Sequence, residues 1–376
     1  MSDFPVPRAY LHDGDGARIC ELNAAVLRSF RTGEMSTASA LISETDEALL
    51  NADPRLGRIL VIESTIYPLI WAGPVVSLEG APFTGTVTIS ARSYESILGE
   101  RYLPSGYALT MSAGGQFTAL LSEVERTNAT GVTIAPNIAA GPPVDDINYG
   151  DRSLLQSWSL LSQMTAHEWW LEHEVARGQL QTAAHYRLER GLDRTADAVL
   201  TVGANGNMRV NRWRSGTDST HQIRAIAGGT STTQGFTERS RVSRRYSSSA
   251  PTPDASVAAL TYTRHGYQFG RWPTGSTIIT RREQLAIMEA VRSYGALATA
   301  AEAALVRANV AQRAIDLEVQ GNPDLWKFCL PGDIITLNLP PYYFVDGYNG
   351  PAAIMATDPR EEMGTLMLTV EVPSAQ

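Results

Sequence analysis

Residues 58–101 read RILVIESTIYPLIWAGPVVSLEGAPFTGTVTISARSYESILGER, and this stretch decides the fold. Three of its segments read as strands: RILVIES (58–64), IYPLIWAGPVVSLEG (66–80) and the beginning of GTVTISARSYESILGER (85–101). The last segment leads into a short helix. The stretch therefore predicts a barrel-like set of hairpins whose final strand continues into an arm.

The first hundred residues as a whole alternate like strands and are punctuated by turns. The turn signals are HDGDG (12–16), RTGE (31–34) and ADPRLG (52–57). Short strands at this spacing favour a small barrel or sandwich over alternating strands and helices.

Helix signals begin in the middle of the chain. Apolar residues at three- and four-residue spacing predict a helix over 116–127. Asp151 can cap a second helix, whose apolar stripe runs from Leu154 to Met164. The intervening residues 128–150 are rich in Gly, Pro, Asn and Asp, so we expect a long loop that is exposed or docked on a neighbour.

Further along, strand and helix signals alternate. HEWWLEHEVA (167–176) and AHYRLERG (184–191) read as strands, and Asn205-Gly206 predicts a tight hairpin turn because Asn-Gly tolerates positive φ. Two T-x-x-E capping boxes, at 280–283 and 299–302, predict two helices. After them the chain returns to strands that alternate as far as Val370.

Composition argues against several functional classes. The formal net charge of −8 argues against a surface that grips nucleic acid. The two cysteines, Cys20 and Cys329, cannot build a disulfide framework or a multi-cysteine zinc site. Residues 1–10 lack the features of a secretory signal, and no apolar run approaches the ~20 residues of a membrane span, so we expect a protein folded in the cytoplasm.

The segment HEWWLEH (167–173) invites a metal interpretation but does not fit one. A zinc-protease helix needs two histidines four residues apart, whereas His167 and His173 are six apart. As a strand, the segment places His167, Trp169, Leu171 and His173 on one face and the glutamates with Trp170 on the other. We interpret it as a half-buried strand and expect no metal ligands, cofactor ligands or catalytic residues in the chain.

Two carboxylate pairs, Asp145-Asp146 and Glu361-Glu362, could in principle act as acid and base on a sugar. Each pair is expected in a polar loop, where solvated charge is the simpler explanation. The aromatic cluster of Tyr342, Tyr343, Phe344 and Tyr348 lies beside prolines and a glycine and is typical of an interface, with a carbohydrate platform as the alternative.

Taken together, these features resemble phage tail hub proteins, the trimeric baseplate-hub proteins that close the end of a tail tube. The resemblance covers most of the chain and includes the N-terminal hub region of tail-associated proteins of siphophages and the baseplate hub of myophages. It rests on four features: Trp71 to Gly73 with the strand ending in Ser93-Tyr94-Glu95-Ser96 and Arg101, the middle from Asp151 to Trp213, the Tyr294-Gly295 break, and LPGDIITL (330–337).

The resemblance implies an α+β fold, mainly β, with two small tube-like β-barrel domains and mixed α/β middle domains. The expected limits are a first β-barrel hub domain over 1–102, middle α+β domains over 103–275, and helices followed by the strands of a second barrel over 276–376. The domains can be discontinuous in sequence. Two related barrels per subunit would let a trimer match the sixfold ring of the tube.

The implied function is structural and not enzymatic: a homotrimeric hub that joins the tail tube to the tail tip and forms or closes the DNA channel. Its implied partners are further copies of itself, the tail tube or distal tail protein ring, and a fibre, spike or tape-measure protein, with genomic DNA only in passage. Its expected location is the virion tail tip, after assembly in the host cytoplasm. Trp71 and the aromatic cluster are the expected interface residues.

Two other functions remain open. A tail-tip cell-wall hydrolase would need a carboxylate pair in a cleft, and Glu361→Gln tests that requirement. A glycan-binding module would use the Tyr342 to Tyr348 loop, and titration with host glycans would detect saturable binding.

Overall fold

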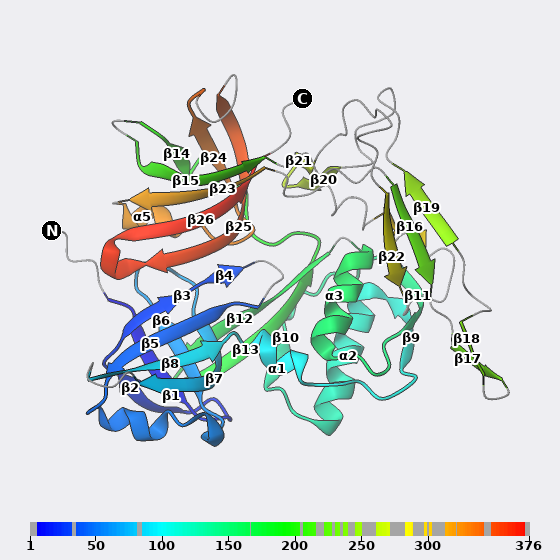
Figure 1. Ribbon diagram of the computed structural model, residues 1–376, viewed down its shortest axis with the longest axis horizontal. Helices are drawn as coiled ribbons and strands as arrows, with labels where there is room; N and C mark the ends of the chain where they lie inside the picture. The colour runs from blue at the N-terminus through cyan, green and yellow to red at the C-terminus, as the bar shows by residue number, and fades with distance from the viewer. Residues whose placement is uncertain are drawn as a thin grey trace.

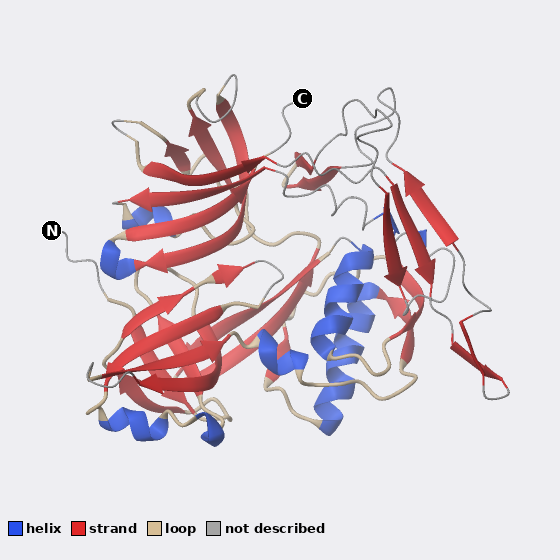
Figure 2. Ribbon diagram, in the orientation of Figure 1, coloured by secondary structure: helices blue, strands red, loops and turns tan. Residues whose placement is uncertain are grey.

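The computed structural model is mostly β, with two large sheets and a central group of helices (Figures 1 and 2). It describes residues 6–31, 35–80, 85–165, 167–203, 206–215, 222–227, 230–233, 236–239, 245–249, 261–270, 283–288, 297–298, 301–302, 313–320, 322–341 and 347–372. The expected α+β, mainly β class is confirmed at this level.

The three central strands of the first large sheet, β6, β7 and β8, come from the stretch quoted at the outset. Seven strands pair in the order β2-β1-β6-β7-β8-β5-β3, so the sheet curves into a half-barrel. Short 3-10 helices η1 (Glu47–Asn51) and η2 (Pro54–Leu56) precede β6, and α1 (Glu95–Gly99) follows β8 as predicted. The strands are β1 (Arg8–His12), β2 (Arg18–Leu22), β3 (Ala25–Arg28), β5 (Thr37–Ser43), β6 (Ile59–Glu63), β7 (Trp71–Gly80) and β8 (Thr86–Arg92).

Alternation of apolar and polar residues explains how this sheet buries one face. In β5, Ala38, Ala40 and Ile42 are buried while Leu41 is exposed, because successive side chains point to opposite faces of a strand. A close approach makes Gly73 necessary, since a Cβ there would lie 1.7 Å from the carbonyl oxygen of Arg92.

The second large sheet joins two distant parts of the sequence. Its strand order is β14-β24-β25-β26-β23-β15, and β4 (Phe30–Arg31) from the N-terminal region adds to β25. The 3-10 helix η4 (Glu361–Met363) connects its last two strands, and α5 (Pro323–Trp326) packs beneath it. The other strands are β14 (Val199–Thr201), β15 (Met208–Ser215), β23 (Arg313–Gln320), β24 (Ile334–Leu339), β25 (Tyr348–Arg360) and β26 (Thr365–Glu371).

The expected turn at Asn205-Gly206 does not make a simple hairpin. Asn205 lies outside the described residues, and the strands on either side of the turn pair elsewhere, β14 with β24 and β15 with β23. They occupy opposite edges of the sheet, which are linked by the bridge between Val202 and Met208 and by the Asn207 amide, which donates to the Thr201 carbonyl at 3.1 Å. The Gly206 amide nevertheless donates to the Gly203 carbonyl at 2.9 Å, so long-range pairing changes the partners of the flanking strands but does not override the turn signal.

Helices and a long hairpin build the middle of the molecule. Helix α2 (Ala113–Thr127) confirms the predicted helix, and the hairpin of β12 (Glu168–Ala176) and β13 (Gln179–Arg187) confirms the predicted strands. Helix α3 (Leu154–Thr165) is also confirmed, but its cap is Ser153 and not Asp151. The Ser153 hydroxyl accepts a bond from the Gln156 amide while the Gln156 side chain bonds the Ser153 amide, a reciprocal capping box.

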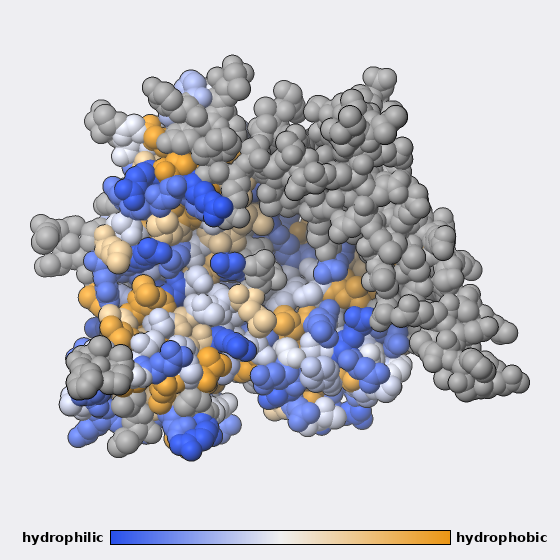
Figure 3. Space-filling view, viewed as in Figure 1, coloured by the Kyte–Doolittle hydropathy of each residue, from blue (hydrophilic) through white to orange (hydrophobic). Residues whose placement is uncertain are grey.

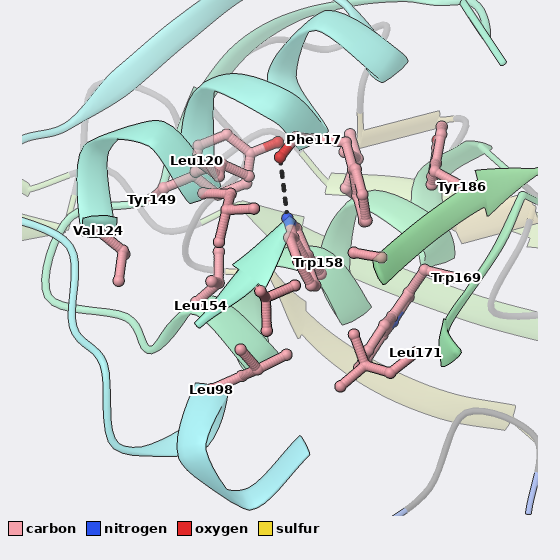
Figure 4. Close-up of a cluster of buried hydrophobic side chains, with 14 of the residues drawn as sticks. Leu98, Phe117, Leu120, Val124, Tyr149, Leu154, Trp158, Trp169, Leu171 and Tyr186 are labelled. Carbon is pink, nitrogen blue, oxygen red and sulfur yellow. Dashed lines mark hydrogen bonds between the residues drawn. The ribbon is translucent and has the colours of Figure 1, made fainter. Parts of the chain in front are cut away.

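Aromatic rings fill the core between these elements (Figure 4). Trp158 on α3 stacks on Phe117 of α2 with ring centroids 4.1 Å apart, and its indole N–H donates to the Phe117 carbonyl at 3.1 Å. Trp169 and Leu171 of β12 and Tyr186 of β13 approach the same cluster from the hairpin. The face of β12 that carries Trp169 and Leu171 is therefore the buried one, which agrees with the predicted half-buried strand.

The expected loop over 128–150 contains two strands. β10 (Val132–Ile134) pairs in parallel with β13, and β11 (Pro143–Asn148) pairs with β9 (Ala108–Ser112). The high content of Gly, Pro and Asn favoured a loop prediction for this segment. It could not indicate these short strands, because their partners lie elsewhere in the sequence.

The predicted helix that starts at the 280–283 capping box is wrong. Residues Glu283–Met288 form strand β22, which pairs in parallel with β16 (Gln222–Ala227). A capping box is a local signal, and here the pairing with β16 overrides it. For the second box, residues 297–298 and 301–302 are helical, while Thr299 lies outside the described residues. The remaining strands are β17 (Thr230–Thr233), β18 (Phe236–Arg239), β19 (Arg245–Ser249), β20 (Thr261–Arg264) and β21 (Tyr267–Gly270).

Candidate functional site at the junction of the two large sheets

The two large sheets are joined by a buried ion pair. The guanidinium of Arg28, on β3 of the first sheet, contacts the Glu361 carboxylate of the second sheet at 2.5 and 3.4 Å. The two side chains are 0% and 1% exposed. Burial lowers the pKa of Arg28, and the Glu361 carboxylate opposes that effect by stabilising the charged form.

Tyr67 makes a second buried connection beside the ion pair. Its hydroxyl lies 2.5 Å from the Thr357 hydroxyl on β25, and its ring is tilted against Phe30 with centroids 5.2 Å apart. The backbone of β4 pairs with Thr357 and Ala356 of the same strand. The segment that precedes Trp71 therefore contributes to the core of the second sheet, which fixes the two sheets against each other.

The β12/β13 hairpin ties the same junction to the middle of the molecule. At its tip, the Arg18 amide donates to the Gly178 carbonyl at 2.9 Å and the Leu180 amide donates to the Gly16 carbonyl at 2.8 Å. Beyond its other end, both carboxylate oxygens of Asp333 accept backbone amides, from Leu192 at 2.7 Å and Leu330 at 3.1 Å. The hairpin thus contacts the first sheet at one end, and the segment after it contacts the second.

A pocket of about 380 Å³ lies where these three parts meet. Its walls come from the segment between β6 and β7, from β12 and β13, and from the turn before β24. Arginines, acidic residues and aromatic rings all line it, including Glu95, Trp170, Arg187, Arg190 and Asp333. A polar pocket of this size is large enough for a small ligand.

The expected interface residues occupy different environments. Trp71 is 2% exposed and donates its indole N–H to the Ser36 hydroxyl at 3.1 Å. Its place at a subunit interface stays a prediction, which this burial within the single chain does not favour. Tyr348 is half-buried on β25 and donates its hydroxyl to the Pro351 carbonyl. Tyr342, Tyr343 and Phe344 lie outside the described residues.

The histidines of the HEWWLEH segment have structural environments. His173 contacts the Thr182 hydroxyl at 3.0 Å, and burial lowers the pKa of this histidine to about 4. Glu172, on the opposite face, accepts a hydrogen bond from the His185 Nε2 at 2.7 Å, and this bond lowers the pKa of the Glu172 carboxyl. Within the described ranges, no three His, Cys, Asp or Glu side chains gather closely enough to hold a metal ion.

The two carboxylate pairs do not lie in simple loops as expected. Glu361 is buried in the ion pair with Arg28, so the interpretation as solvated loop charge is wrong for this residue, whereas Glu362 is exposed. Asp145 and Asp146 lie within strand β11, at the irregularity of its pairing with β9. Glu361 does not line the pocket described above.

Sequence reasoning missed the residues that form the junction. Arg28 and Glu361 are 333 positions apart, so no spacing rule brings them together. One signal in the sequence could have indicated a buried charge here. In the alternating pattern of β3, Arg28 occupies the same inward-facing side as the buried Val26. Among the residues that the structure describes, no helix is long and apolar enough to cross a membrane.

No family model matches the sequence, and no curated protein matches it. Solved structures of similar fold do match along nearly all of its length. A tail protein from Neisseria meningitidis MC58 aligns with a TM-score of 0.58 at 14% identity, covering 98% of this chain and 97% of its own.

Two prophage proteins align equally well. The 43 kDa tail protein of prophage MuSo2 from Shewanella oneidensis gives a TM-score of 0.59 at 13% identity and covers 98% of both chains. Prophage tail protein gp18 from Listeria monocytogenes EGD-e gives 0.54 at 11% identity, covering 98% of this chain and 95% of its own. The chain therefore has the fold of phage tail proteins, in agreement with the resemblance to tail hubs seen in its sequence.

Proposed function

We propose that this protein is a structural component of a phage or phage-like tail, a homotrimeric hub that joins the tail tube to the tail tip or baseplate. The observation that carries the proposal is the pair of curved seven-stranded sheets held together by a buried junction. Two β units fixed in one chain would give six such units in a trimer. A ring of six matches a sixfold tube without requiring six separate proteins.

The junction supports this role because a hub must hold its two β units in a constant relative position. If the two units moved apart, Arg28 and Glu361 would each lose the opposite charge that compensates their burial. That loss is costly in a low-dielectric environment, so the buried ion pair opposes such movement. The second sheet also takes strand β4 and the side chain of Tyr67 from the N-terminal region. The two units therefore share hydrogen bonds and a core, which resists relative motion.

In the proposed assembly, the partners are two further copies of the chain, the tail tube or distal tail protein ring, and a fibre, spike or tape-measure protein. Genomic DNA passes through a channel that the trimer forms or closes, and the two sheets belong to small tube-like barrels. The loop with Tyr342, Tyr343 and Phe344, together with Tyr348, is the proposed contact with a neighbour. The role is structural and not catalytic, in a virion tail assembled in the host cytoplasm.

Exposed apolar side chains of the described residues do not form a contiguous patch on the face shown in Figure 3, where they are interspersed with polar ones. Leu27 and Leu41, on the neighbouring strands β3 and β5, are 55% and 44% exposed. Exposed leucines of this kind are ordinary on a protein surface, so the proposed contact between copies rests on the pair of sheets and not on an apolar patch.

Gold-labelled antibodies against the purified protein would test the location on isolated tail particles. Label at one end of the tails, and absent from their length, is the expected result. Mass spectrometry of the intact tails establishes that they contain the protein. Label spread along the tube of such tails, or no label on them, would contradict the hub role.

A further inference from the structure

The pocket at the sheet junction is lined by two arginines, Arg187 and Arg190, for which the described residues provide no carboxylate ion pair. Arg190 lines the pocket, and no hydrogen bond or ion pair joins its guanidinium to any residue in the described ranges. Arg187 lines the same pocket, and its Nε is buried without a hydrogen-bond partner. Burial of Arg190 lowers its pKa, which reflects the cost of holding the charge there.

The nearby carboxylates act on these arginines through their charge: Glu168 and Glu95 oppose the lowering of the Arg190 pKa. Most of their hydrogen bonds, however, go to other groups. Glu168 accepts the Arg190 backbone amide at 2.7 Å and also pairs with Arg264. Asp333 uses both oxygens on backbone amides, and Glu172 pairs with His185. Among the described residues, the two guanidinium groups therefore lie near carboxylate charge without a direct carboxylate hydrogen-bond partner.

Glu95 is the remaining acid in the pocket, and it forms no ion pair with Arg190 or Arg187. One of its carboxylate oxygens is buried with no hydrogen-bond partner. Burial raises the pKa of Glu95 and so favours its neutral form, although the Arg190 charge opposes this effect.

An aromatic wall completes the pocket. The indole of Trp170 lies under the Arg190 guanidinium, whose central carbon is 5.6 Å from the ring centroid. The same indole stacks on His185, with planes 2° from parallel and centroids 4.9 Å apart. The stacked rings hold Arg190 in place, so its N–H groups remain available to a ligand without a large loss of side-chain entropy.

We propose that this pocket binds a carboxylate group, with Arg190 and Arg187 as its principal ligands. A guanidinium presents parallel N–H donors that match the two oxygens of a carboxylate, and such charge-assisted pairs are the strong hydrogen bonds of proteins. The source of the carboxylate is either a small free acid or an aspartate or glutamate side chain of another polypeptide. The inference does not depend on the proposed hub function.

Calorimetric titration of the purified full chain with two probes would test the proposal. The probes are sodium succinate and a capped tetrapeptide with one central aspartate, each titrated at constant ionic strength with sodium chloride as the reference. Saturable binding of succinate identifies a site for free acids, and binding of the peptide alone identifies a site for a protein side chain. Saturation by neither probe would overturn the proposal.

Variants localise the binding. Arg190→Gln and Arg187→Gln are each expected to weaken binding by about tenfold or more, because each removes a hydrogen-bonded charge pair. Arg126→Gln is the matched control, since it removes the same charge from the exposed surface of α2, where Arg126 pairs with Glu123. Equal binding by wild type, both pocket variants and the control would show that the pocket is not the site and would overturn the proposal. Circular dichroism of each variant establishes that it is folded before titration. If one pocket variant does not fold, the titration of the other one still tests the proposal.

Discussion

The buried Arg28–Glu361 pair gives the sharpest prediction about how the two sheets are held together. Arg28→Ala leaves the Glu361 carboxylate 1% exposed without its counter-charge. Breaking one partner of a buried pair typically costs about 3–5 kcal/mol, because the remaining charge must be desolvated without compensation. We therefore expect Arg28→Ala to lower the free energy of unfolding by this amount.

The double variant Arg28→Met/Glu361→Leu separates the charge from the packing. It removes both charges and keeps similar side-chain volume, so its loss is expected to be about 2 kcal/mol or more smaller than that of Arg28→Ala. Urea titration followed by tryptophan fluorescence and circular dichroism measures both, with coincident curves required for a single transition. A loss below about 1 kcal/mol for Arg28→Ala, or an equal loss for the double variant, would refute this reasoning.

Three further predictions concern the core and one titrating group. Trp158→Ala should destabilise the protein by about 3–5 kcal/mol in the same urea assay, because it removes the ring that stacks on Phe117; a loss under 1 kcal/mol would contradict that packing. Gly73→Ala should prevent close pairing next to Arg92 and shift the urea midpoint strongly downwards, whereas an unchanged midpoint would show that the strand can move aside. The folded pKa of His173, about 4, lies below its ordinary value of 6.5, so the folded state binds fewer protons than the unfolded state between these values. The His173 contribution to stability is therefore present above pH 6.5 and lost as the pH falls towards 4; thermal unfolding of wild type and His173→Gln over this range should show a steeper fall for wild type, and parallel curves would contradict it.

Local patterns predicted those elements whose stability is largely determined nearby. The strands and short helix of 58–101, the helix over 116–127 and the hairpin from Glu168 to Arg187 follow from alternation and helical spacing. The burial of Trp169 and Leu171 on one face of β12 follows from the same alternation. These features depend on neighbours within a few residues or across one hairpin.

Long-range pairing determined the features that the sequence did not reveal. Residues 283–288 carry a helix-start signal, yet they form β22 because β16 offers a parallel partner. Strands β14 and β15 flank an Asn-Gly turn but attach to strands more than a hundred residues away. Arg28 and Glu361 illustrate the same limit for the site, since an ion pair across the whole chain has no local signature.

The proposed domain limits at 102 and 275 stay predictions, although the sheets show how the units are connected. The second sheet combines β14 and β15 with β23 to β26, so one β unit draws on both sides of the segment between them. Such an arrangement is expected where a middle region is inserted into a β unit, and it agrees with the expectation that domains can be discontinuous.

The oligomeric state tests the central claim of a trimeric hub most directly. Multi-angle light scattering of the purified protein at two concentrations gives its absolute mass, to be compared with the 40.8 kDa of one chain. The account predicts a species of three times that mass, unchanged between the two concentrations. A single species of 40.8 kDa at both concentrations, which also fails to form rings when mixed with isolated tail tubes, would contradict it.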